Sequence, residues 1–241
     1  MMPGRLYGLG VGPGDPELIS MKAFRLLQES DVVAYPTGRD DGGYALAAVD
    51  PHLRDDHILL PMKYPATAGA IADSPDYPQL MQDYYDATSD QISTHLDADR
   101  DVALICLGDP FFYGSYMYWH SRLAEKYETT VVPGISSVMA GPASLDKPLC
   151  HRTDTMTVIP ATLPEEDIET RLRAADSAVL MKLGRTLPKV RRVLDRIGRL
   201  DQAWLVERAT MDDERIVPMT DDTVEKAGYF SIIVIPCATP V

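Results

Sequence analysis

The stretch RLYGLGVGPGD, residues 5–15, joins a strand-like apolar segment directly to a turn with glycines at positions 8, 10, 12 and 14. Glycines at a strand end let the backbone approach a ligand closely, and a purely structural turn needs fewer of them. The spacing does not fit the dinucleotide-binding fingerprint, because the third glycine would fall on Pro13 or Asp15. We therefore expect a ligand-binding loop of another kind at the carboxyl edge of a sheet.

Two further stretches show the same order of a buried strand followed by a turn. They are DVALICLGDPFFYGS, residues 101–115, and TTVVPGISSV, residues 129–138. Each taken alone has a structural interpretation, with Asp109 as a helix cap or turn former and Ser136 and Ser137 as helix caps. Taken together with the first stretch, they predict three strand-end turns that meet at one edge of a parallel sheet.

Strands and helices alternate around these turns. Residues 5–11, 31–36, 57–61, 101–108, 129–133, 155–160 and 177–183 are expected to be strands, and residues 17–30, 77–98, 113–126, 135–145 and 187–198 helices. A helix is also expected after Pro164, and three more strands end the chain. The pattern predicts an α/β fold of two tandem α/β domains, residues 1–133 and 134–241.

The charge balance excludes a typical nucleic-acid-binding protein. The net charge is -13, whereas binding to phosphates needs a basic face. The chain has 26 Asp against 10 Glu and 16 Arg against 7 Lys. Such an Asp-rich, Lys-poor surface favours adaptation to high salt, where like-charge repulsion is screened. The alternative is an ordinary protein with one solvated acidic face.

Neither a metal site nor a membrane anchor is expected. The three cysteines are far apart in the sequence, and the five histidines form no cluster with metal-ligand spacing. No stretch reaches the roughly 18 apolar residues of a membrane span, and no signal peptide is expected. We therefore expect a cytoplasmic protein with reduced cysteines.

The motifs GVGPGD, GDPFFYGS, VVPGISS, VLMKLGR and ERAT together resemble those of the tetrapyrrole (corrin/porphyrin) methylase family. The resemblance runs from about residue 5 to residue 236 and implies two α/β domains with S-adenosylmethionine in the cleft between them. Within the family, MKLGRTLPKVRRVL, AWLVERATM and YFSIIVI are similar to the branch that methylates carbon 20 of precorrin-2 or cobalt-factor II in cobalamin biosynthesis. The family also implies a homodimer.

The resemblance places cofactor contacts at specific positions. Pro13 lines the cofactor cleft, and Leu107, Gly108 and Asp109 bind the methionine part, with Asp109 facing its ammonium group. Lys182 and Ala209 contact the adenosine through the backbone. The full implied set is Pro13, Leu107, Gly108, Asp109, Phe112, Tyr113, Ser136, Ser137, Lys182 and Ala209.

The chemistry that this resemblance implies needs no acid–base pair. Methyl transfer from a sulfonium releases a neutral thioether, so alignment of donor and acceptor is the main requirement, and we name no catalytic residue. The substrate carries eight carboxylates, and the candidate partners are Arg39, Lys63, Arg185 and Lys189, each of which is also an ordinary surface cation. Uroporphyrinogen III methylation, a diphthine synthase-like protein methylation and a non-catalytic nucleotide-binding module are the alternatives. The sequence leaves open whether the acceptor contains cobalt.

Overall fold

The structure, a computed structural model, describes residues 3–38, 42–65 and 74–237, and it divides into two compact units. The first unit ends at Ser136 and the second begins at Ser137, and each unit has its own five-stranded sheet. No helix in the described ranges is long and apolar enough to cross a membrane. The α/β fold class predicted from the alternation of strands and helices is confirmed.

All strand pairs in the sheet of the first unit are parallel. The strands stand in the order β3-β2-β4-β1-β5, so β1 lies between β4 and β5. Every position of β1 and β4 is buried, as expected for central strands of a parallel sheet with both faces covered. The strands are β1 (Leu6–Gly10), β2 (Val32–Thr37), β3 (Ile58–Lys63), β4 (Val102–Cys106) and β5 (Thr129–Val132).

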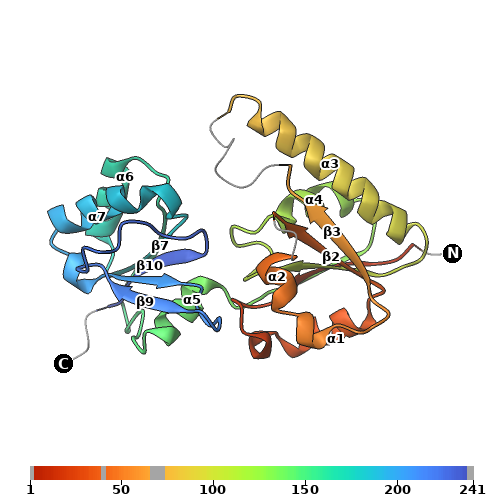
Figure 1. Cartoon of the computed structure of the whole chain (residues 1–241), viewed down its shortest axis with the longest axis horizontal. Coiled ribbons are helices and arrows are strands. Elements are labelled where there is room, and N and C mark those ends of the chain that lie inside the picture. Colours follow the sequence, from red (N-terminus) through yellow and green to blue (C-terminus); the bar gives the residue numbers. More distant parts are fainter. Residues whose placement is uncertain (1–2, 39–41, 66–73, 238–241) are drawn as a thin grey trace. The chain divides into compact units, whose positions relative to one another are not determined.

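Helices cover both faces of this first sheet (Figure 1). α3 and α4 pack on one face, around the fully buried Trp119, and α1 and α2 pack on the other. The first helix begins later than residue 17, because Asp15 caps a short 3-10 turn and Ser20 then caps α1 through the N–H of Ala23. The helices are α1 (Met21–Glu29), α2 (Gly43–Ala47), α3 (Tyr77–Leu96) and α4 (Tyr116–Leu123), with 3-10 turns at Pro16–Leu18 and Asp50–His52.

The sheet of the second unit is mixed. Its order is β6-β7-β10-β8-β9, and of these neighbours only β6 and β7 run parallel. The strands are β6 (Met156–Pro160), β7 (Ser177–Met181), β8 (Trp204–Glu207), β9 (Arg215–Pro218) and β10 (Ser231–Ile235). β10 is buried at every position and forms the centre of the sheet.

One face of the second sheet is covered by two helices and the other by one short helix (Figure 1). α6 (Glu165–Ala174) and α7 (Leu187–Arg196) enclose the larger core, and 3-10 turns lie at Gly184–Thr186 and Leu200–Gln202. α5 (Ser137–Ser144) lies close to β10 on the other face. A Cβ on Gly141 would lie 2.6 Å from Cδ1 of Ile232, so glycine permits this close packing.

Candidate functional site

The turns that follow β1 and β4 are joined by backbone hydrogen bonds beyond the ends of the two strands. The N–H of Val11 donates to the carbonyl of Cys106 at 3.0 Å, and the N–H of Gly108 donates to the carbonyl of Gly12 at 2.7 Å. Gly12 and Gly108 form an isolated antiparallel bridge. The prediction that these strand-end turns meet at one sheet edge is therefore confirmed for the first two stretches.

The turn after β5 packs against the same place through glycine backbone. A Cβ on Gly134 would lie 2.1 Å from the carbonyl oxygen of Gly108, and a Cβ on Gly10 would lie 2.4 Å from the nitrogen of Gly134. Real side chains do not come this close, so the contact of the three turns depends on glycine. A Cβ on Gly108 itself would meet only the Cα of Ser136, at 3.8 Å. The main chain at Gly108 is therefore uncovered on that side.

Asp109 ties two of the turns together with its carboxylate. Oδ1 accepts a hydrogen bond from the N–H of Phe111 at 2.9 Å, and Oδ2 accepts one from the N–H of Gly134 at 3.1 Å. Asp109 is not a helix cap, because α4 begins at Tyr116 and follows Ser115. The helix-cap interpretation is therefore wrong, whereas the turn interpretation is confirmed.

The aromatic cluster after β4 divides into exposed and buried members. Phe112 and Tyr113 are 36% and 44% exposed, with ring centroids 5.0 Å apart, and Tyr113 has a φ of 56°. Tyr116 is fully buried, and its ring lies across β1, where a Cβ on Gly8 would lie 2.3 Å from Cζ. Phe112 and Tyr113, the two predicted cofactor contacts in this cluster, are therefore both exposed.

The remaining predicted residues of the first unit lie at or near the same edge. Pro13 is buried in the turn after β1, and Leu107 is half-buried directly after β4. Ser136 is the last residue of the first unit, and Ser137 is the first residue of α5. In the first unit the structure therefore brings together Pro13, Leu107, Gly108, Asp109 and Ser136.

The predicted residues of the second unit lie in two turns with left-handed backbone at residues other than glycine. Lys182 follows β7, is exposed and has a φ of 59°. After β8, Arg208 and Thr210 have φ values of 49° and 69°, and Ala209 between them is 6% exposed. Such backbone is uncommon outside glycine, and for the β-branched Thr210 it is strained.

Two carboxylates that are not among the predicted site residues bind segments that follow β8: Glu207, the first residue of the ERAT motif, and Glu214. Glu207, 5% exposed, accepts hydrogen bonds from the N–H of Gly228 at 2.9 Å, from Ser231 Oγ at 3.3 Å and from Arg215 at 3.0 Å. Burial alone would raise the pKa of Glu207, but these three donors outweigh it and hold the pKa below its ordinary value. Glu214 accepts hydrogen bonds from Thr210 and Ser144. The sequence signals for Glu207 are its place at the end of the apolar run WLVE and at the start of the ERAT motif.

The predicted basic residues have different surroundings. Lys63 ends β3 and Arg185 lies in the turn Gly184–Thr186, and both are exposed. Lys189 is half-buried in α7, and its ammonium donates to the carbonyl of Leu163 at 2.6 Å, so it has a structural role inside its own unit. Arg39 lies outside the described residues.

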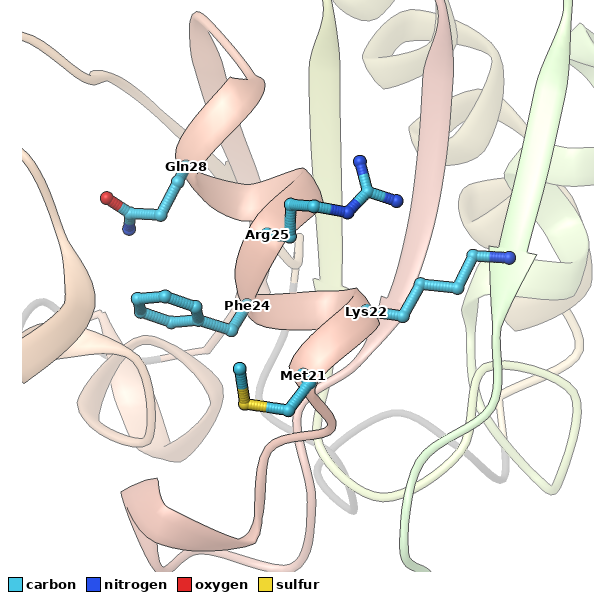
Figure 2. Close-up of a pocket in the computed structure, with 5 residues that line it drawn as sticks. All are labelled: Met21, Lys22, Phe24, Arg25 and Gln28. Atoms are coloured by element: carbon cyan, nitrogen blue, oxygen red, sulfur yellow. The ribbon is translucent and has the colours of Figure 1, made fainter.

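A shallow surface pocket lies away from these turns, along α1. It is lined by Met21, Lys22, Phe24, Arg25 and Gln28. Figure 2 shows that Met21, Phe24 and Gln28 extend to one side of the helix and Lys22 and Arg25 to the other. All five residues belong to α1, so this pocket includes none of the predicted site residues.

Metal and thiol chemistry find no support at the strand-end turns. Among the described residues, no group of three or more His, Cys, Asp or Glu side chains could hold a metal ion. Cys106 ends β4 directly before the GDP turn, and burial raises the pKa of its thiol to about 12. The thiol is therefore protonated and behaves as a small apolar side chain.

Comparison with known proteins agrees with this arrangement of turns. Residues 5–225 match the model of the Tetrapyrrole (Corrin/Porphyrin) Methylases. The chain is 40% identical over 233 residues to the precorrin-2 C(20)-methyltransferase of a Sinorhizobium species, covering 97% of this chain and 95% of that protein. It is 28% identical to the cobalt-precorrin-2 C(20)-methyltransferase of Salmonella typhimurium, covering 97% of each protein.

A solved structure shares the fold. The uroporphyrin-III C-methyl transferase of Thermus thermophilus, complexed with S-adenyl homocysteine, superposes with a TM-score of 0.64 at 22% identity, covering 96% of each chain. At this identity the likeness shows the fold alone. The family model and the full-length relatives, together with the strand-end glycine turns, show that the chain belongs to the tetrapyrrole (corrin/porphyrin) methylase family.

Proposed function

We propose that the chain transfers a methyl group from S-adenosylmethionine to carbon 20 of precorrin-2 or cobalt-factor II in cobalamin biosynthesis. The observation that carries the proposal is 40% identity, over nearly the whole length of both chains, to a relative that bears this activity in its name. The glycine turns after β1, β4 and β5 support it, because they form a main-chain surface of the kind that small ligands approach.

The residues present fit a ligand of this type. The uncovered main chain at Gly108 and the exposed Phe112 offer a polar backbone and an apolar face at the same sheet edge. Pro13 is buried in the turn after β1, Leu107 is half-buried directly after β4, and Asp109 fixes the turn that follows. In this proposal Leu107, Gly108 and Asp109 hold the methionine part, and Phe112, Tyr113, Ser136 and Ser137 surround it. Lys182 and Ala209 present backbone groups to the adenosine.

S-adenosylmethionine carries its methyl group on a sulfonium. When the methyl group is transferred, the rest of the molecule leaves as a neutral thioether. The chain's own residues therefore have to bind and align rather than exchange protons. The turns meet this requirement, because the glycine contacts and the Asp109 hydrogen bonds fix the backbone. Lys63, Lys189, Arg185 and Arg39 remain proposed partners of the substrate carboxylates, and the ammonium of Lys189 also donates to the carbonyl of Leu163.

Mass spectrometry of the product tests the proposal. Incubation with S-adenosylmethionine and precorrin-2, with and without cobalt in the ring, should add one methyl group, which NMR places at carbon 20. The relative named for the cobalt-free substrate is 40% identical and the one named for the cobalt substrate 28%, which favours precorrin-2. Addition at another carbon, or turnover of uroporphyrinogen III alone, would contradict the assignment.

We also propose that the protein is a cytoplasmic homodimer. The dimer rests on the family resemblance, and β3 offers apolar surface at a sheet edge, with Ile58 and Leu59 40% and 44% exposed. Sedimentation equilibrium should give twice the chain mass of 26.6 kDa at micromolar concentration. A species of the single-chain mass would contradict it.

Adaptation to high salt is the last part of the proposal. It rests on the net charge of -13 and the excess of Asp over Glu. The unfolding midpoint should rise between dilute buffer and molar potassium chloride, where the Debye length falls to about 3 Å. An unfolding midpoint that is equal in both solutions would contradict the proposed adaptation to high salt.

A further inference from the structure

The turn after β8 is strained, and two carboxylates contact it: Asp213 pairs with the guanidinium of Arg208, and Glu214 accepts a hydrogen bond from the backbone of Thr210. Arg208 and Thr210 adopt left-handed backbone, with φ values of 49° and 69°. For a β-branched residue this conformation is strained and persists only where neighbouring groups enforce it. At Thr210 the left-handed backbone is accompanied by a hydrogen bond from its N–H to a carboxylate.

Glu214 makes the required contact. Its Oε2 accepts a hydrogen bond from the backbone N–H of Thr210 at 2.6 Å. The same oxygen accepts a hydrogen bond from Oγ of Ser144, the last residue of α5, at 2.5 Å. The glutamate thus joins the strained turn to the end of the helix that begins at Ser137. Hydrogen bonds to a charged acceptor are stronger than neutral ones, so this one oxygen can hold the turn.

We propose that Glu214 is a positioning residue that keeps the turn Arg208–Met211 in the conformation in which its backbone receives the adenosine of the cofactor. The inference deepens the proposed function and rests on it, because the adenosine contact at Ala209 is part of that proposal. Glu214 acts through the main chain of Thr210 and touches neither methyl donor nor acceptor.

Calorimetric titration with S-adenosylhomocysteine tests the proposal. Glu214→Ala removes both hydrogen bonds and should weaken binding by about tenfold or more, which corresponds to the loss of one charge-assisted bond. Glu214→Gln keeps an oxygen with two lone pairs but loses the charge, so it should weaken binding less than Glu214→Ala does. Asp212→Asn removes one charge from the same turn at an exposed position and is the matched control, with unchanged affinity.

A rescue experiment separates positioning from general stability. Glycine adopts left-handed backbone without strain, so Thr210→Gly should restore the affinity of the Glu214→Ala chain to within about threefold of the natural value. A purely structural role of Glu214 would not be rescued in this way, because glycine adds no contact. Circular dichroism at the titration temperature shows that each variant is folded. If Glu214→Ala does not fold, Glu214→Asp replaces it, since it keeps the charge but shortens the side chain by one methylene group.

The outcomes distinguish this inference from the proposed function. Absence of binding to the natural chain would overturn the proposed function itself. Binding to the natural chain with equal affinity for Glu214→Ala would overturn only the role of Glu214. A weakened Glu214→Ala chain that Thr210→Gly does not rescue would also overturn it, since the strained backbone would then not be what the carboxylate holds.

Discussion

The two units build their strand-end turns by opposite means. In the first unit, Gly10 and Gly134 pack against each other and against the carbonyl of Gly108 at distances that exclude a side chain on either residue. In the second unit, Lys182, Arg208 and Thr210 adopt left-handed backbone although none of them is glycine. There, the buried carboxylate of Glu207 and the half-buried carboxylate of Glu214 hold the segments that follow β8.

This difference shows two physical sources of a fixed backbone. Where glycine supplies the conformation, the backbone carries no strain from a side chain, and close packing and hydrogen bonds such as those of Asp109 hold the turn. Where larger residues adopt the same backbone, the conformation stores strain that distant side chains must offset. We therefore expect a glycine turn to lose stability when a side chain is added to it. A strained turn should lose stability when the side chain that holds it is removed.

The largest effect is expected for Gly134→Ala in the first unit. The new Cβ would lie 2.1 Å from the carbonyl oxygen of Gly108 and 2.7 Å from the Cα of Gly10. Both neighbours are backbone atoms at the end of buried strands, so they cannot move aside as a flexible side chain would. We expect a loss of more than about 3 kcal/mol in the free energy of unfolding, measured with urea.

Gly38→Ala is the matched control for this substitution. A Cβ at Gly38 meets no atom within 4 Å among the described residues, and its φ is not positive. Its effect should stay within about 0.5 kcal/mol. If both variants lost similar amounts of unfolding free energy, the close contact at Gly134 would not be the cause of the loss.

The next effect is expected for the buried carboxylate of the second unit, with Glu207→Gln. The neutral amide cannot replace a carboxylate that accepts from Gly228, Ser231 and Arg215, so we expect a loss of about 2 kcal/mol near neutral pH. The pKa of Glu207 in the folded chain is below its ordinary value of 4.5. The stabilisation is therefore fully present above that value and is lost as the pH falls through the folded pKa.

Urea unfolding of both chains at about pH 7 and about pH 3.5 checks this dependence. The difference between natural and variant chains should shrink at the lower pH. Glu225→Gln, at an exposed position, should change stability by less than about 0.5 kcal/mol. A difference for Glu207→Gln that is equal at both pH values would mean that its charge does not stabilise the turn.

A smaller effect is expected for Asp109→Asn, which returns to the first unit. Asparagine keeps one acceptor oxygen, so it can retain the bond from Phe111 or the bond from Gly134, but not both. We expect a loss of about 1 kcal/mol in unfolding free energy and a further weakening of S-adenosylhomocysteine binding. An unchanged unfolding midpoint with weaker binding would instead assign the carboxylate's charge to the ligand alone.

The sequence predicted the first unit's turns better than the second unit's for a physical reason. The sequence shows glycines beside Pro13 and Asp109, and parallel strands place their carboxyl ends at one edge of the sheet. The contact between these turns could therefore be predicted from the local sequence pattern. The strain at Thr210 depends on Glu214, and no local signal marks that pairing. The ERAT motif was recognised only through the family resemblance.

Helix starts were predicted less well where a side chain decides them. The expected helix over 17–30 is divided, because Asp15 and Ser20 each cap a separate segment. The helix expected from residue 113 begins at Tyr116, because Asp109 bonds to the β5 turn and Tyr113 adopts left-handed backbone. Apolar periodicity does not contain these interactions, so it predicted the helices but not their first residues.

The smallest effect is expected for Lys182→Gly, and it tests whether the second unit's turns store strain. Lys182 has a φ of 59° at an exposed position, so glycine should relieve about 1 kcal/mol of backbone strain. Glycine also gains freedom in the unfolded chain, which offsets roughly the same amount, so the net change should be below about 1 kcal/mol. Lys182→Ala removes the same side chain but keeps the Cβ, and urea unfolding should find it no more stable than Lys182→Gly. If the glycine variant is less stable than the alanine variant by more than about 1 kcal/mol, the backbone at Lys182 is unstrained. The contrast between the two units would then rest on the turn after β8 alone.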